Sequence, residues 1–388
     1  MADYVERQLE SKLVDMAQWF PIVAITGPRQ SGKSTLARHA FPQYDYVNLE
    51  DPQIRASALE DPVSFIRNRP DHLIIDEAQY APNLFSMIQV ASDERNTPGQ
   101  YILTRSQNFH MMQHIGQSLA GRVGLLKLLP FSYQELWESS LTSKDTDPFT
   151  LRGGYPRLYS ASIPLDIYFQ SYIETYIERD VAGLLGVRDR TAFRKLLYAC
   201  AHLAGRLVNI SSLANDIDVS TATIRSWLSM LESSYLIFFQ QPYHANLKKR
   251  LTKKPKLYFY DTGLLCHLLH IETTGELVSH ALFGEIFENL IIAETAKCSF
   301  NTAKTLELYF YRDDSKREVD LLDYTLSRPQ AAEIKSSRTY HAKYATQLTS
   351  VCNDLSIDEQ DRFVIARVED TYHTDNCTVS SAHDWLIR

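Results

Sequence analysis

The sequence predicts an α/β protein with a parallel-sheet domain, a helical middle and a separate α/β end domain. Short apolar runs alternate with helical stretches up to about residue 150, and after about residue 270 one helix precedes several short strands. We therefore expect domains at residues 1–150, 151–270 and 271–388. The 388 residues, 44% hydrophobic and 22% charged, suffice for several hydrophobic cores.

In the first domain, three short apolar runs predict buried strands of a parallel sheet. They cover residues 21–26, 73–75 and 101–104, and each run ends in glycine or polar residues. Because ligands of open α/β sheets bind at the carboxyl edge of the strands, we expect these end residues to line a site.

The middle domain carries two short helical patterns followed by an apolar strand. Residues 211–217 and 219–232 predict the helices, and residues 235–240 predict the strand. This order is typical of a winged helix-turn-helix, whose second helix can enter a DNA major groove. The alternative is a packing module without a nucleic-acid partner.

The end domain is predicted as α-β-β-β-α-β. The pattern gives a long apolar helix, three strands, a second helix that starts at His341, and a last strand. The expected ranges are 282–298 for the first helix and 307–311, 318–323, 331–335 and 362–368 for the strands.

The net charge of −7 is unevenly distributed along the chain. The first domain carries 13 basic and 18 acidic side chains (−5), the middle 15 and 9 (+6), and the end 12 and 20 (−8). Residues 248–256 contain six of the positive charges. This segment is either a solvated basic loop or a surface that contacts the phosphates of a nucleic acid.

The loop after the first strand matches G-x-x-x-x-G-K-[ST] between a strand and a helix. Glycines let the backbone amides turn inward around phosphates. Lys33 is expected to reach the β and γ phosphates, and the Ser34 hydroxyl to bind Mg²⁺. The loop consists of Gly27, Pro28, Arg29, Gln30, Ser31, Gly32, Lys33, Ser34 and Thr35.

Two carboxylates follow the second apolar run and complete this site. Asp76 is placed to hold Mg²⁺ through its water shell, and Glu77 to polarise the attacking water. The sequence has no guanine-reading N-K-x-D, so ATP is the expected nucleotide.

The chain resembles the prokaryotic AAA+ ATPases that carry a carboxy-terminal domain of unknown function. The ordered motifs behind this resemblance span nearly the whole chain. Beyond the loop and residues 76–79 they are residues 103–107, 118–122, 153–156, 258–264, 318–320 and 333–335.

The resemblance implies further nucleotide-site residues. It assigns Thr104 and Ser106 as phosphate sensors and Arg122 as a sensor or finger arginine. The position between the two sensors is usually glycine in that family, whereas here it is Arg105. This arginine either replaces a sensor function or obstructs the site. The alternative for Arg122 is a surface charge or a helix cap.

The end domain contains a possible metal-dependent nuclease constellation. Asp320, Glu333 and Lys335 form a D…E-x-K pattern, and the period of two places Glu333 and Lys335 on one strand face. Glu288, with Glu285 as second choice, adds a carboxylate from the preceding helix. Such carboxylates, above all Asp320 and Glu333, suit divalent cations in phosphodiester hydrolysis. The element order resembles restriction endonucleases, although E-x-K also occurs by chance.

These observations predict an ATP- and Mg²⁺-dependent ATPase that acts on nucleic acid, with DNA preferred, and has a nuclease-like end domain. The alternative is a nucleotide-switched interaction protein whose end domain is an inactive scaffold. A DNA-binding regulator would rest on the helix-turn-helix alone. No apolar run is long enough for a membrane span, and five widely spaced cysteines fit a reducing cytoplasm. Self-association is expected if a neighbour's arginine completes the site.

Overall fold

The computed structural model describes residues 4–69, 71–105, 119, 121–181, 189–243 and 254–388. The chain folds as two compact units, of which the first contains Met1–Pro130, Ser233–Tyr235 and Phe300–Ala303. The second contains the remaining residues of the chain. The predicted division into three domains differs from these two units and stays a prediction.

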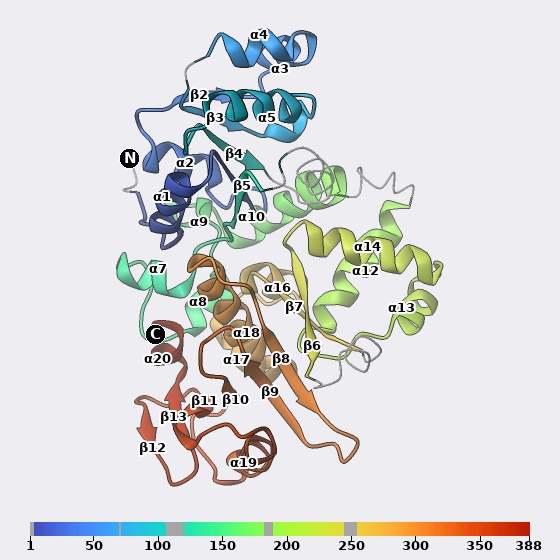
Figure 1. Cartoon of the computed structure of the whole chain (residues 1–388). Coiled ribbons are helices and arrows are strands. Elements are labelled where there is room, and N and C mark those ends of the chain that lie inside the picture. Colours follow the sequence, from blue (N-terminus) through green and yellow to red (C-terminus); the bar gives the residue numbers. More distant parts are fainter. Residues whose placement is uncertain (1–3, 70, 106–118, 120, 182–188, 244–253) are drawn as a thin grey trace. The chain divides into compact units, whose positions relative to one another are not determined.

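The first unit is built on a parallel five-stranded sheet (Figure 1). Its strand order is β2-β3-β4-β1-β5, so β4 lies between β3 and β1 at the centre. All four strand pairs are parallel, which places every carboxyl end at one edge. The strands are β1 (Ile22–Thr26), β2 (Asp45–Asn48), β3 (Leu73–Asp76), β4 (Tyr101–Arg105) and β5 (Val123–Lys127).

Helices cover both faces of this sheet because its central strands are apolar on both sides. Alternate residues of β1 belong to different cores: Ile22 and Ala24 pack with α4 and α5, and Val23 and Ile25 with α1 and α2. The elements between the strands are α1 (Leu9–Trp19), α2 (Lys33–Ala40), α3 (Pro52–Glu60), α4 (Pro62–Arg67), η1 (Ala78–Tyr80) and α5 (Leu84–Arg95).

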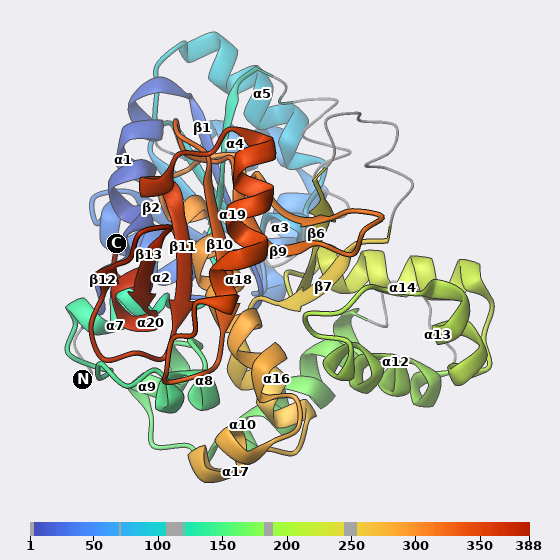
Figure 2. The same cartoon turned by 90° about the horizontal axis from the view of Figure 1, so that it is seen from below.

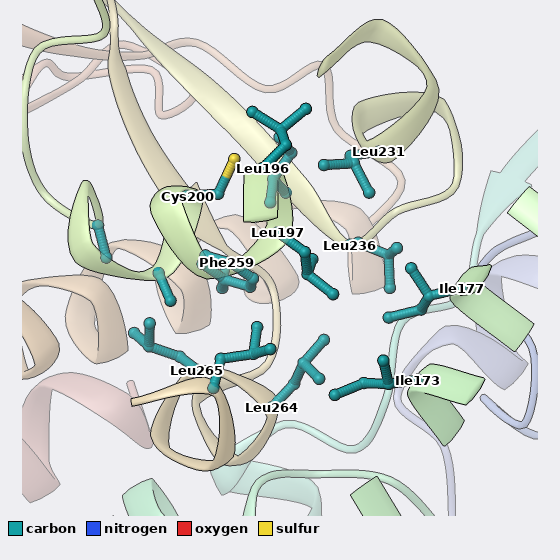
Figure 3. Packing of buried hydrophobic residues seen from close by; sticks show 14 of the residues in the cluster. Ile173, Ile177, Leu196, Leu197, Cys200, Leu231, Leu236, Phe259, Leu264 and Leu265 are labelled. Atoms are coloured by element: carbon teal, nitrogen blue, oxygen red, sulfur yellow. The ribbon is translucent and has the colours of Figure 1, made fainter. Parts of the chain in front are cut away.

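The second unit begins with helices around one large apolar core (Figure 3). Leu196, Leu197 and Cys200 lie on one face of α12 and point into this core. Helix α7 (Tyr133–Glu138) precedes the helices of this core, which are α8 (Asp147–Arg152), α9 (Arg157–Ser160), α10 (Leu165–Tyr172), η3 (Ile173–Val181), α12 (Arg190–His202), α13 (Ile210–Ile217) and α14 (Thr221–Ser233).

The helix pair predicted in the middle of the chain is confirmed as α13 and α14. Asn209 caps α13 by accepting a hydrogen bond from the Ser212 amide, and Asp218 closes the helix in the left-handed region at φ 64°. Ile224, Trp227 and Leu231 bury one face of α14. The opposite face is exposed, with Thr221, Ala222, Arg225, Ser226 and Ser229.

The second unit also contains a mixed eight-stranded sheet of order β12-β13-β11-β10-β9-β8-β6-β7 (Figure 2). Helix α19 packs on β9, β10 and β11 through Ala345, Leu348 and Val351. The strands are β6 (Ile237–Pro242), β7 (Lys256–Phe259), β8 (Leu308–Arg312), β9 (Glu318–Asp323), β10 (Gln330–Lys335), β11 (Arg362–Ala366), β12 (Tyr372–His373) and β13 (Thr378–Ser381).

The predicted order α-β-β-β-α-β is confirmed as α18-β8-β9-β10-α19-β11. The sequence did not reveal that β6 and β7 extend the same sheet through β8. No helix in the described ranges is long and apolar enough to cross a bilayer. The remaining helices are α16 (Thr262–Leu268), α17 (Thr274–Ser279), α18 (Phe283–Asn301), α19 (Lys343–Leu355), η4 (Glu359–Asp361) and α20 (Ala382–Leu386).

Candidate functional site

The loop between β1 and α2 has a backbone that requires its glycines. Gly27 adopts φ 154°, and a Cβ there would overlap the carbonyl oxygen of Leu128. Gly32 precedes α2 in the left-handed region at φ 93°. The amino end of α2 therefore faces the loop, where its free N–H groups and dipole favour an anion.

Lys33 is buried at the first turn of α2, and its ammonium points back across the loop. Nζ donates to the carbonyl oxygens of Gly27 at 3.1 Å and Pro28 at 2.7 Å. Burial lowers the pKa of Lys33 to about 8, although the charges of Glu77 and Asp76 act to raise it. A phosphate in the loop would add negative charge next to this ammonium and so favour its protonated form.

A buried arginine, Arg7, supports the backbone of the loop, and the loop contains an unused hydroxyl donor. Arg7 donates to the carbonyl oxygens of Ser31 at 2.8 Å and Leu129 at 2.7 Å, which fixes the loop to the start of the unit. The Ser31 hydroxyl is buried and has no hydrogen-bond partner among the described residues. Such an orphaned donor inside the loop suits a phosphate oxygen. Arg29 pairs with Glu50 at 3.3 Å.

Asp76, at the end of β3, is held by three hydroxyl groups. Ser34 donates to Oδ1 at 2.7 Å, Tyr46 donates to Oδ2 at 2.6 Å, and Thr104 also donates to Oδ1. The Ser34 hydroxyl and the Asp76 carboxylate are hard oxygen ligands from two elements that meet at one point. They therefore fit a Mg²⁺ ion that also binds nucleotide phosphates.

Glu77 follows Asp76 in the left-handed conformation at φ 53°. Its amide donates to the Thr104 hydroxyl at 3.4 Å, and Gln79 Nε2 donates to its carboxylate. A non-glycine residue with positive φ is uncommon and indicates a backbone set by its surroundings. Loop, Asp76, Glu77 and Thr104 therefore meet at the carboxyl edge, as predicted, while Ser106 lies outside the described residues.

Arg122 does not join these residues within the chain. It directly precedes β5, and its carbonyl oxygen accepts a hydrogen bond from the Ile22 amide at 3.3 Å. This places it at the amino edge of the sheet, a strand's length from the loop. Its guanidinium pairs with Asp93 at 2.5 Å. The surface-charge alternative describes this position, and a finger role remains a prediction for contact with a neighbouring chain.

We expect Tyr46→Phe to weaken Mg²⁺ binding without unfolding the chain. The substitution removes the hydrogen bond that orients Asp76 Oδ2, and loss of such a supporting partner typically costs about 10–100-fold in metal affinity. The measurement is the Mg²⁺ concentration that half-saturates ATP hydrolysis. Tyr44→Phe is the matched control because, among the described residues, the Tyr44 hydroxyl donates only to the Gly99 carbonyl, at 2.8 Å. An unchanged Mg²⁺ requirement would contradict the assignment of Asp76.

A second charged cluster lies in the second unit, around Lys256 at the start of β7. Its buried Nζ lies 3.0 Å from Glu288, 2.8 Å from Glu318 and 3.7 Å from Asp320. Burial alone would lower the pKa of Lys256, but these three carboxylates outweigh it and raise the pKa. Tyr258 on the same strand donates to Glu288 at 2.6 Å.

Glu333 and Lys335 complete this cluster, on one face of β10 as predicted. Lys335 Nζ lies 2.6 Å from Glu333 and 3.7 Å from Asp320. The Ile334 amide donates to Asp320 at 2.9 Å. Burial, with the charge of Asp320 next, raises the pKa of Glu333 to about 8. Burial and Asp320 likewise raise that of Glu288 to about 7.

The predicted end-domain residues thus converge, but around an ammonium. Glu288 joins Asp320, whereas the second choice, Glu285, pairs with Arg206 at 2.5 Å instead. Lys256 occupies the space between the carboxylates that a cation would need. Within the described ranges, no group of three His, Cys, Asp or Glu side chains is arranged to hold a metal ion. Asp320 and Glu333 in this arrangement do not fit the predicted metal site.

Sequence reasoning missed several residues of both sites. Arg7 and Tyr46 lie outside every recognisable motif, and the local pattern of Lys256 and Glu318 gives no sign of their pairing. Lys256 was placed in a basic surface segment, but the structure buries it in a strand. Residues 248–253 of that segment lie outside the described residues.

The first unit is a P-loop nucleotide-binding domain of the AAA type. Residues 20–137 match the family described as AAA domain, and residues 143–275 and 283–385 match two domains of unknown function. Uncharacterized proteins of Mycobacterium tuberculosis and Mycobacterium bovis are each 32% identical over 325 residues, covering 82% of this chain and 71% of theirs. The chain belongs to the same family of prokaryotic AAA-type proteins as these two.

Solved structures resemble the chain more distantly. A Walker-type ATPase of Pyrococcus abyssi is 15% identical with a TM-score of 0.46, covering 69% of this chain and 96% of its own. DnaA from Aquifex aeolicus is 15% identical with a TM-score of 0.29, covering 58% and 85%.

Proposed function

We propose that the chain binds ATP with Mg²⁺ and hydrolyses it at the carboxyl edge of the first sheet. The observation that carries this proposal is the convergence of a buried lysine, a Ser–Asp pair and an adjacent glutamate on one glycine-dependent loop. Phosphoryl transfer needs mainly positioning and charge neutralisation, and these residue types supply both.

Each residue then has a separate task. Lys33 turns from its loop carbonyls to the β and γ phosphates, and the loop amides bind the remaining phosphate oxygens. Ser34 and Asp76 hold Mg²⁺, which would neutralise charge on the phosphates. Glu77 accepts the proton of the attacking water. ATP is favoured over GTP because the sequence lacks N-K-x-D.

Glu77→Gln tests this proposal. We expect phosphate release to fall about 10²–10⁴-fold because the amide cannot accept the proton of water. Affinity for ATP should stay within about twofold because the loop, Lys33 and Asp76 remain. Gln134→Ala, a change on the exposed face of α7, is the control. Turnover at the parent rate in Glu77→Gln would show that Glu77 does not accept the proton of the attacking water.

We further propose that nucleotide turnover acts on nucleic acid, preferably DNA, through the middle of the chain. The α13–α14 pair, with its exposed outer face, has the form of a helix-turn-helix, and the β6–β7 hairpin follows it in the position of a wing. A hollow of about 610 Å³ at this place is lined by residues that include Arg225, Ser229 and Lys254.

The measurement is ATP hydrolysis with and without duplex DNA over a range of salt concentrations. Stimulation that weakens steeply with added salt supports the nucleic-acid proposal, because phosphate contacts release counterions. Arg225→Ala should reduce the stimulation but not the basal rate. Salt-independent turnover with no bound DNA would contradict it.

A second candidate is a nucleotide-switched interaction protein whose end domain does not cut. The Lys256 ammonium among the carboxylates favours it, because cleavage would need a metal ion there. We also propose that the end domain is restriction-endonuclease-like, on the element order α-β-β-β-α-β. Metal-dependent nicking that Asp320→Ala abolishes would support an active nuclease, and no nicking would favour the scaffold.

A further inference from the structure

Arg105 is an unusual cation because it is almost completely buried beside the nucleotide loop. It ends β4, the strand between β3 and β1, and only 2% of its surface is exposed. Its Nε atom has no hydrogen-bond partner among the described residues. A buried guanidinium with an unused donor carries a large desolvation cost, so such groups normally face an anion.

The position of Arg105 relates it to both halves of the phosphate site. It is the register partner of Thr26, the last residue before the loop, so both side chains leave the same face of the sheet. The preceding Thr104 points to the other face and bonds Asp76. Arg105 therefore ends β4 between the loop after β1 and the Asp76–Glu77 pair after β3.

The charges around Arg105 leave room for one more anion. Glu77 acts electrostatically on both Lys33 and Arg105, so one carboxylate serves two buried cations. Burial lowers the pKa of Arg105 to about 10, and the Glu77 charge only partly opposes this. Asp76 is already bonded by three hydroxyl groups.

We propose that Arg105 is an intramolecular phosphate sensor, whose guanidinium binds the terminal phosphate of a nucleoside triphosphate and has no such partner with a diphosphate. This inference rests on the proposed function, because it requires a nucleotide in the loop. Of the two roles that the sequence left open for Arg105, a sensor or an obstruction of the site, the proposal selects the sensor. It also needs no arginine from a neighbouring chain.

Tyr235 is a further neighbour of this position within the first unit. Its hydroxyl lies 2.8 Å from Thr26 Oγ1, and Arg105 acts electrostatically on the same phenol. Ser233–Tyr235 belong to the first unit, whereas the residues before and after them belong to the second. The segment that directly follows α14 is therefore held next to the proposed sensor.

The test measures, by calorimetry on the full chain and in the presence of Mg²⁺, the affinity for two nucleotides. They are AMP-PNP, a non-hydrolysable triphosphate, and ADP. Arg105→Met should weaken triphosphate binding about 10–100-fold because a charge-assisted contact is lost, and change ADP binding by less than about twofold. The triphosphate affinity of Arg105→Lys should lie between those of the parent and of Arg105→Met. Without nucleotide, Arg105→Met should unfold at the parent temperature or above it, because a buried charge with an unused hydrogen-bond donor is removed.

Arg7→Met is the matched control, since Arg7 is also buried in the first unit but bonds two carbonyl oxygens. This variant should unfold at a lower temperature than the parent, and its affinities for the two nucleotides should fall by the same factor. Arg105→Met behaving like Arg7→Met, or an unchanged ratio of the two affinities, would overturn the sensor. If the parent chain bound neither nucleotide, the proposed function itself would fail.

Discussion

Lys33→Ala is expected to reduce ATP hydrolysis by about 10²–10³-fold, the usual loss when one donor to a developing charge is removed. The ammonium of Lys33 is buried at the loop, and within the described part of the chain it donates hydrogen bonds to two loop carbonyls. Phosphate oxygens would bind it more strongly, so its main interaction energy is gained when the nucleotide binds. Phosphate release at saturating ATP measures the effect.

Lys12→Ala is the matched control for the loss of a lysine from the first unit. Lys12 pairs with Asp15 at 3.3 Å on the surface, and both side chains are about 41% exposed. Surface ion pairs of this kind contribute little, so turnover and stability should stay near those of the parent. Equal turnover in Lys33→Ala and Lys12→Ala would show that hydrolysis occurs elsewhere.

The lowered pKa of Lys33 adds a pH signature. In the chain without nucleotide, Lys33 loses its proton near pH 8, below the ordinary value of 10.5. Binding of a phosphate requires the charged form, so ATP affinity should fall as the pH rises above about 8. In Lys33→Ala this decline should vanish. A parent affinity that stays constant between pH 7 and pH 10 would contradict a phosphate contact at this lysine.

The phosphate site could be predicted because its signals are local. The glycine spacing of the loop and the apolar strands before Gly27 and Asp76 are visible within short windows of sequence. Strand β2 was not predicted, because only Val47 of its four residues is buried. Tyr46 on this strand supports Asp76 across 30 residues, and no local pattern reveals such a contact.

The end-domain cluster shows the opposite case. Alternation along β10 correctly placed Glu333 and Lys335 together, because a strand has a period of two. Lys256 comes from a strand about 60 residues before β9, and its basic neighbours predicted either a solvated loop or a surface that contacts phosphates. Only the tertiary pairing of β6 with β8 brings β7 into the same sheet, so a metal site was predicted where an ammonium lies.

Lys256→Met should lower the free energy of unfolding by about 3–5 kcal/mol, because removal of one partner leaves buried carboxylates uncompensated. Only 5% of the Lys256 side chain is exposed, and Glu288 and Asp320 are nearly as buried. Chemical denaturation followed by circular dichroism measures the loss. Lys144→Met is the control because its partner, Asp370, is 84% exposed. Equal stability of both variants would contradict the buried ion pairs.

The loss in Lys256→Met should depend on pH in a defined direction. The pKa of Glu288 is raised to about 7 and that of Glu333 to about 8, so the folded chain binds more protons than the unfolded chain between about pH 5 and pH 8. Stability therefore falls as the pH rises through this window. In Lys256→Met, which lacks the ammonium, the free energy of unfolding should fall more steeply with rising pH. The difference in stability between the variant and the parent should therefore be smallest near pH 5.

Added Mg²⁺ or Mn²⁺ then distinguishes the two candidate functions of the end domain. If Lys256 takes the place of a cation, millimolar metal should stabilise Lys256→Met but not the parent, because only the variant leaves the carboxylate oxygens unoccupied. Asp320→Asn added to the variant should remove this effect. If added metal stabilised the parent as much as the variant, the carboxylates would bind a metal ion beside Lys256. That result would support the nuclease proposal, which requires a metal ion at this site.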